Sequence, residues 1–137
     1  MSIVQGLTTS FKLQAWQAGQ NLATDTLKIA LYTSSAALDY TTTAYSPTNE
    51  VVATGYAAGG QVLTGQVLAS SGQTVYLTFN NPVWSAALTA RCALIYNTTR
   101  ANASVAVLDF GSDKTSSTLF TISMPGNTAT TALIRAT

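Results

Sequence analysis

Residues 82–114 read PVWSAALTARCALIYNTTRANASVAVLDFGSDK, and they predict two β-strands joined by a polar turn. Apolar residues occupy every second position of residues 88–94, and this period of two indicates a strand with one apolar face. Residues 97–102 supply turn chemistry, and residues 104–108 are apolar enough on both faces for an interior strand, which Gly111 should end. This hairpin predicts a β-rich binding or structural module and contains no catalytic constellation.

Length and composition predict one domain with a nearly neutral surface. The chain has 137 residues, which favours a single β-sandwich domain spanning residues 1–137. Only 8% of the residues are charged and the formal net charge is +1, against about 25% charged residues in an average soluble domain. The basic residues are scattered, so no stripe follows a phosphate backbone, and nucleic acid is not expected as a partner. So weak a net charge suits a protein that works in an assembly.

The sequence contains no signal for a membrane or for secretion. No stretch approaches the roughly 18 uninterrupted apolar residues of a membrane span, so no membrane partner is expected. Residues 1–10 have neither a basic n-region nor a long apolar h-region, so cytoplasmic synthesis is expected. Cys92 is the only cysteine, and its place on the apolar face of a strand predicts a small buried hydrophobe and not a reactive thiol.

One short helix is predicted at about residues 9–21. Residues 8–10 are Thr-Thr-Ser and offer hydroxyl N-caps, and an apolar stripe with helical spacing accompanies them. The stripe consists of Leu7, Phe11, Ala15, Ala18 and Leu22. Residues 19–21 favour a left-handed cap, so the helix should end there. Trp16 lies off the centre of the stripe, and packing in the core or in an interface is expected of it.

Four further segments have the two-residue period or the composition of strands. These segments are residues 27–32, 74–79, 119–124 and 132–136. Residues 61–69 are also apolar, and Gly65 inside them predicts a bulge or a bend. Six to eight antiparallel strands with turns at short intervals predict an all-β fold, a β-sandwich.

A long loop is predicted at about residues 33–60, because this stretch has no sustained period and is rich in Ser, Thr, Asn and Pro. Loops of this length usually carry function or become ordered against a partner. Aromatic side chains in irregular segments offer contact area at a low entropic cost. The candidates for partner contacts are Tyr40, Tyr45, Tyr56 and Trp84. The alternative is that the tyrosines fold back over the edge of the sandwich.

The sequence offers little for catalysis or for binding a cofactor. It has no histidine, which removes the usual general base and the commonest zinc ligand. Its five carboxylates have no spacing that places two of them on one face of a strand at the separation of a glycosidase. Asp109 and Asp113 bracket a Gly-Ser turn, but two carboxylates are few for a calcium site. No catalytic, cofactor-binding or metal-binding residue is predicted, and the chain is not expected to be an enzyme.

Four stretches together carry a family resemblance. They are ALYTSSAALDYTTTAYSPTNEV at 30–51, TGYAAGG at 54–60, NPVWSAALTARCALIYN at 81–97 and VAVLDFGSDK at 105–114. In order and spacing they are similar to a family of small virion proteins of tailed bacteriophages. Such proteins resemble capsid decoration, or cement, proteins, which are jelly-roll β-sandwiches that form small oligomers on the outside of an icosahedral head. The resemblance implies a structural virion protein on the capsid surface, made in the host cytoplasm, which binds the major capsid protein as a homo-dimer or homo-trimer.

The resemblance leaves the contact surface to be inferred from the residues. The loop at 33–60 and residues 1–7 are irregular and poor in charge, so we expect them to contact the capsid. Two alternatives stay open. One is a tail or fibre component of the same virion, and the other is a carbohydrate-binding module that stacks sugars on exposed Trp84, Tyr56 or Tyr40.

Overall fold

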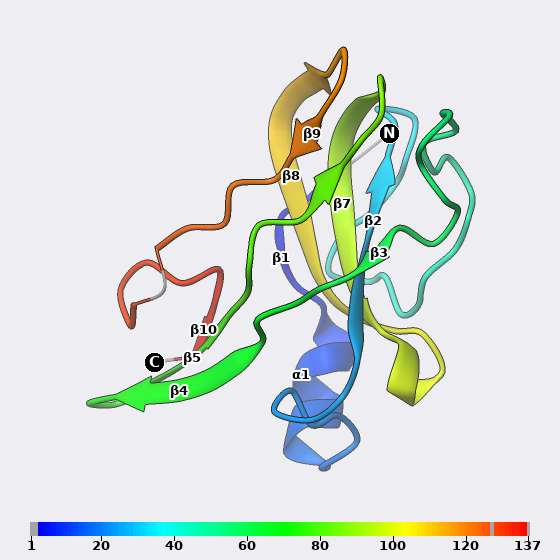
Figure 1. Cartoon of the computed structure of the whole chain (residues 1–137). Helices are drawn as coiled ribbons and strands as arrows, with labels where there is room; N and C mark the ends of the chain where they lie inside the picture. The colour runs from blue at the N-terminus through cyan, green and yellow to red at the C-terminus, as the bar shows by residue number, and fades with distance from the viewer. Residues whose placement is uncertain (1–2, 127, 137) are drawn as a thin grey trace.

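The computed structural model describes residues 3–126 and 128–136, which form an all-β sandwich with one short α-helix (Figure 1). Within these residues the elements are β1 (Gly6–Leu7), α1 (Thr9–Trp16), β2 (Leu27–Tyr32), β3 (Gln61–Val62), β4 (Val67–Ser71), β5 (Thr74–Thr78), β6 (Val83–Trp84), β7 (Thr89–Asn97), the 3-10 turn η1 (Thr98–Arg100), β8 (Ala103–Thr115), β9 (Phe120–Thr121) and β10 (Ile134–Ala136). Six of the ten strands in the described part have three or more residues, and the other four have two residues each. The total of ten in the described residues exceeds the predicted six to eight, and the two-residue strands account for the difference.

A five-stranded sheet in the order β1-β8-β7-β2-β3 forms the body of the molecule. A second sheet has the order β10-β5-β4, and β6 and β9 form a two-stranded ribbon. All strand pairings in these sheets are antiparallel, as the sequence predicts. The hairpin predicted at 82–114 is confirmed as β7 and β8. Its turn is η1 followed by Ala101 and Asn102, which adopt positive φ angles of 54° and 61°.

The second strand of this hairpin passes through Gly111 and does not end there. The prediction of a strand end at this glycine is wrong, because β8 continues to Thr115. Gly111 has a φ of 82°, and its N–H donates to Asp109 Oδ1 at 2.9 Å. The pairing of β7 with β8 shifts register between Ala90 and Cys92, opposite this irregular segment. A glycine inside a strand thus marks a bulge, after which the pairing resumes.

The five-stranded sheet is buried on both faces. The larger core cluster includes Ile29, Ile95 and Val105 on one face. The second cluster lies on the other face and joins side chains of β2, β7 and β8 to Ala36 and Leu38 of the long loop. The loop predicted at about 33–60 is therefore confirmed as irregular chain, and it covers the second face of its own sheet.

Isolated bridges tie this loop to neighbouring segments. Leu38 pairs with Ile3, Ala44 pairs with Ala103, and Glu50 pairs with Tyr32. These contacts add to the backbone hydrogen bonds within the loop, such as those from the N–H of Ala36 to Thr33 O at 3.1 Å and from the N–H of Gly60 to Ala57 O at 2.9 Å.

The helix is shorter than the predicted 9–21. The hydroxyl of Thr8 caps α1 by accepting from the N–H of Phe11 at 3.2 Å, but the helix ends at Trp16. Ala18 already adopts a left-handed φ of 58°, so the reversal comes one residue before Gly19. Phe11 of the predicted stripe is buried, and Leu7 and Leu22 pack against the core at its margin.

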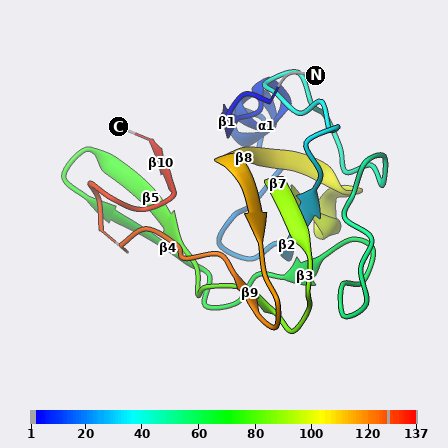
Figure 2. The same cartoon turned by 90° about the horizontal axis from the view of Figure 1, so that it is seen from above.

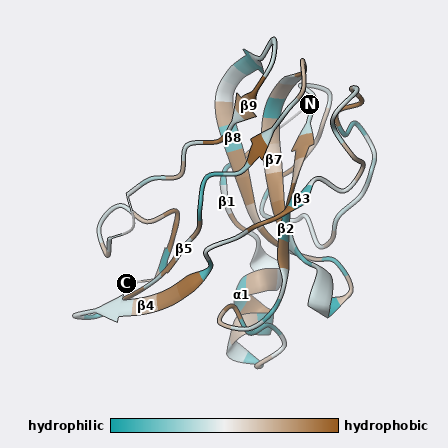
Figure 3. Ribbon diagram, viewed as in Figure 1, coloured by the Kyte–Doolittle hydropathy of each residue, from teal (hydrophilic) through white to brown (hydrophobic). Residues whose placement is uncertain are grey.

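The three strands β4, β5 and β10 project from the body, and we call them the β-arm (Figure 2). The chain bends away from the body between β3 and β4, where Gly65 has a φ of 66°, so the bend predicted there is confirmed. At the base of the β-arm, Leu77, Phe79 and Ile134 are buried in the larger core cluster. Figure 3 shows that β4 is hydrophobic toward the body and paler toward its tip.

Candidate contact surface

The four predicted contact residues lie in different environments. Trp84 is only 4% exposed, and its ring lies against those of Tyr56 and Phe120, with centroid distances of 6.1 Å in both cases. Tyr56 is also buried, so the expectation that these two side chains lie on the surface is wrong. Tyr45 is partly buried and stacks on Tyr96, with ring centroids 4.7 Å apart. Tyr40 is 59% exposed and is the member of the set that faces solvent.

Two of these tyrosines form a cluster around the buried Glu50. The carboxylate accepts from Tyr45 Oη at 2.6 Å, from Tyr56 Oη at 2.6 Å and from the N–H of Gly59 at 2.7 Å. Burial raises the pKa of both tyrosines, and the hydrogen bonds to Glu50 raise it further, since a phenolate there would face a carboxylate. The hydroxyl of Tyr56 also accepts from the N–H of Leu31 at 2.8 Å. The cluster thus fastens the long loop to β2.

The exposed apolar side chains near the N-terminus lie on three segments that backbone hydrogen bonds join. The N–H of Val4 donates to Leu38 O and the N–H of Thr9 donates to Tyr40 O, each at 2.9 Å. The exposed apolar side chains of these segments are Val4, Leu13, Trp16 and Tyr40, and we call them the helix-side surface. Trp16 is 94% exposed, and Leu13 lies one turn before it on the same face of α1.

Buried polar groups hold α1 and its exit against the hairpin. Thr8 Oγ1 lies 2.8 Å from Ser104 Oγ, and Gln20 Nε2 donates to Ser104 O at 3.2 Å. Burial would raise the pKa of Asp25, but hydrogen bonds from Arg100, from the backbone of Asn21 and from Asn97 outweigh it, and this pKa is lowered. These hydrogen bonds therefore hold α1, which carries Leu13 and Trp16 of the helix-side surface, in place against the hairpin.

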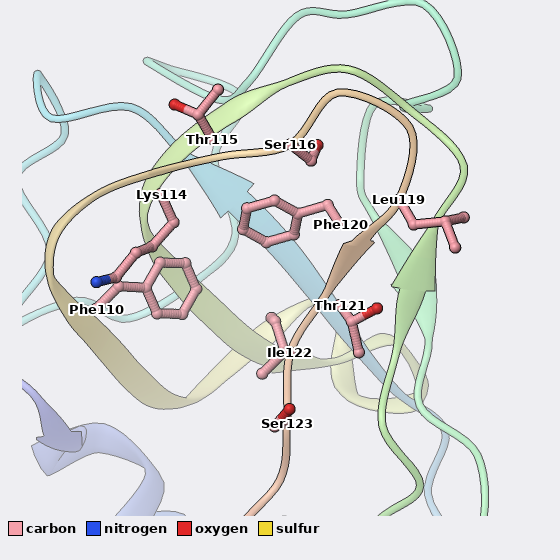
Figure 4. A pocket seen from close by; sticks show the side chains of 9 residues that line it. All are labelled: Phe110, Lys114, Thr115, Ser116, Leu119, Phe120, Thr121, Ile122 and Ser123. Carbon is pink, nitrogen blue, oxygen red and sulfur yellow. The ribbon is translucent and has the colours of Figure 1, made fainter.

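A shallow hollow of about 450 Å³ lies between the end of β8 and β9 (Figure 4). Phe110, Phe120 and Ile122 gather in it, and Leu119 and Lys114 lie at its sides (Figure 4). Its lining contains no carboxylate, so it offers no pair of carboxylates for acid–base catalysis.

Asp109 and Cys92, near the bulge of the central hairpin, have structural roles. Asp109 pairs with Arg91 Nε at 3.2 Å and also accepts from Gly111, so it caps a bulge. Burial raises the pKa of the Cys92 thiol to about 11, with Asp109 adding to the effect. No group of three or more His, Cys, Asp or Glu side chains in residues 3–126 and 128–136 is placed to hold a metal ion. No helix in the same residues is both long and apolar enough to cross a membrane.

Comparisons of the chain with protein families, with curated proteins and with solved structures give no match. The function therefore has to be argued from the geometry of this chain and from the resemblance described above.

The sequence places Trp16 off the centre of the apolar stripe and predicts that it packs in the core or in an interface. Trp16 is 94% exposed, so packing in the core is wrong, and packing in an interface stays a prediction. Five residues separate it from the buried Phe11, which at about 100° per residue places the two side chains roughly 140° apart around the helix. This angle is the signal that predicts an outward-facing tryptophan.

Proposed function

We propose that the protein is a structural component of a tailed-phage virion, which binds the outside of the capsid and stabilises contacts between major capsid subunits. The observation that carries the proposal is the helix-side surface, where Trp16 is 94% exposed. Tryptophan is among the residues that contribute most to protein–protein binding when a partner covers them. The identity of the partner and the place in a virion are inferred from the resemblance. The exposed surface supplies a physical means of binding.

The composition of the surface favours a protein partner. Trp16 and Tyr40, the exposed aromatic side chains of the helix-side surface, are 94% and 59% exposed. Aromatic residues are enriched at protein–protein interfaces relative to the rest of the surface. Two of the three aromatic platforms expected for a carbohydrate-binding module, Trp84 and Tyr56, are buried, which disfavours that alternative.

Binding of this kind stabilises an assembled shell by mass action. A ligand that binds the assembled lattice and not the free subunits shifts the equilibrium toward the lattice. Each contact needs only ordinary affinity when a dimer or trimer engages two or three lattice points at once.

The test is retention on purified heads that lack the protein, measured by co-sedimentation over a range of added protein concentrations. We expect Trp16→Ala to weaken binding by about 30-fold, which corresponds to roughly 2 kcal/mol for an interface tryptophan. Leu119→Ala is the control, because Leu119 is 59% exposed, as is Leu13, but lies beside β9. A deletion inside the long loop is unsuitable, since Ala36 and Leu38 belong to the second core cluster.

Three results would contradict the proposal. If the Trp16→Ala and Leu119→Ala variants are retained equally on heads, the helix-side surface is not the binding surface. Binding to purified tails in place of heads would favour the tail or fibre alternative. Absence of binding to every virion fraction would reject the virion role.

A further inference from the structure

The outer strand of the β-arm is an open sheet edge. In the sheet order β10-β5-β4, the strand β4 pairs with β5 on one side, and no other described segment pairs with its outer side. The five residue pairs from Val67↔Thr78 to Ser71↔Thr74 run without a register shift. Such a strand presents a regular row of backbone N–H and C=O groups to solvent, which is a template for pairing with another chain.

The usual protections of an exposed edge are missing from this strand. Soluble proteins shield edge strands with charged side chains, with proline or with a bulge. Residues 51–90 contain no Asp, Glu, Lys or Arg, and β4 has the sequence VLASS, without proline. The one charged residue of the β-arm is Arg135 on β10, and β5 separates it from the β4 edge.

One face of the β-arm is mostly apolar, with Ser70 as a polar member, and it is covered only in part. The register places Leu68 opposite Leu77, and Leu77 opposite Ile134, so these three side chains share a face. Leu77 and Ile134 are buried, whereas Leu68 on the outer strand and Val75 nearer the tip are each 44% exposed. An added strand beside β4 would extend this face and shelter Leu68.

We propose that the outer edge of β4 pairs with the β4 edge of a second copy of this chain, antiparallel and about a two-fold axis at Ala69. This register places Val67 of each copy opposite Ser71 of the other, and Leu68 opposite Ser70. The apolar face then continues from one copy into the next as a six-stranded sheet. Identical surfaces that carry charge repel each other, and the absence of charge from residues 51–90 removes that repulsion.

The contact is short, so the dimer is a concentration-dependent equilibrium and not an obligate state. Five residues from each copy meet, and part of the apolar face is already covered within each chain. This inference does not rest on the proposed function, because it concerns only the chain and its copy.

The first test measures the oligomeric state of the full chain by sedimentation velocity over a wide concentration range. We expect the wild type to dimerise, and Ala69→Lys and Ala69→Glu to weaken the dimer at least tenfold, because each places two like charges opposite each other at the axis. A 1:1 mixture of the two variants should restore dimers as a mixed pair. Gln73→Lys is the control, since it adds the same charge at the exposed tip of the β-arm, away from the β4 edge. Circular dichroism of each variant checks that the fold is kept.

The second test is a cross-link. Opposite residues of an antiparallel pair have Cα atoms about 4.5–5.5 Å apart, within the range of a disulfide. Mild oxidation should therefore join Ala69→Cys copies into a covalent dimer, and Gln73→Cys copies should stay unlinked. A monomeric wild type at the highest concentration, a trimer, or an Ala69→Lys variant that dimerises like the wild type would overturn the proposal.

Discussion

Replacement of Glu50 by alanine is expected to loosen the long loop and to lower the free energy of unfolding. The Glu50 carboxylate is buried and accepts three hydrogen bonds, of which those from Tyr56 Oη and from the N–H of Gly59 go to the same oxygen, at 2.6 and 2.7 Å. Alanine leaves these two buried donors without an acceptor. An unsatisfied buried group costs about 1–3 kcal/mol, so the loss should be about 2–6 kcal/mol, a large part of the stability of a small domain.

Glu50→Gln separates the hydrogen bonds from the rest of the side chain. The amide oxygen can accept from Tyr56 and Gly59, and its NH₂ group can donate to the hydroxyl of Tyr45, which is partly exposed. We therefore expect Glu50→Gln to lose less than half of what Glu50→Ala loses. Asp113→Ala is the matched control for the removal of a carboxylate, because Asp113 is exposed, and a change within about 0.5 kcal/mol is expected.

The assay is urea-induced unfolding, followed by far-ultraviolet circular dichroism and by tryptophan fluorescence. Trp84 is a useful probe because its ring centroid lies 6.1 Å from that of Tyr56. A Glu50→Ala variant within about 1 kcal/mol of the wild type would refute the reasoning, since the two donors would then have other acceptors. So would a loss for Glu50→Gln as large as that for Glu50→Ala.

Two further predictions concern alkaline pH and a close backbone contact. Four tyrosines have a raised pKa, chiefly through burial: Tyr32, Tyr45, Tyr56 and Tyr96. The unfolded chain releases these protons first, at about pH 10, so the free energy of unfolding should be full below that pH and should fall as the pH rises through the pKa values of the folded state. Denaturation midpoints from pH 8 upward measure this fall. A flat profile above pH 10 would contradict the prediction. Gly60→Ala should destabilise the fold far more than Gly111→Ala. Both glycines have positive φ, so the backbone strain of an alanine is common to the two variants. A Cβ at Gly60 would lie 1.8 Å from Ile29 O, whereas a Cβ at Gly111 meets nothing within 4 Å. Equal denaturation midpoints for the two variants would show that the backbone yields at Gly60.

The sequence predicts the strands in which apolar and polar residues alternate regularly. The alternation in residues 27–32 and 74–79 gives β2 and β5, and the paired runs of residues 82–114 give the central hairpin, because a period of two is a property of each strand by itself. The bend at Gly65 is also predicted from local sequence, because a glycine inside an apolar run indicates a break in strand pairing. These features are local, so the sequence contains them.

The candidate site was less predictable because it depends on irregular chain. Ala36 and Leu38 cover the second face of the sheet, but no periodicity in residues 33–60 distinguishes buried side chains from exposed ones. For the same reason the aromatic residues there and at Trp84 were expected on the surface, although Tyr56 and Trp84 are buried. Trp16 had a readable signal in its angle to Phe11, but the expected helix length extended the stripe to Ala18 and weakened that contrast.

The helix-side surface and the β-arm complement each other physically. Figures 1 and 2 both show the tip of the β-arm pointing away from α1, and the β4 edge and the helix-side surface share no residue. A dimer of this kind carries two such surfaces at a fixed separation. When one has bound to a repeating lattice, the other meets its own site at an effective concentration far above that in solution, so two modest contacts hold firmly if the lattice spacing fits. Under the proposed function, such a dimer would stabilise a shell through two linked contacts.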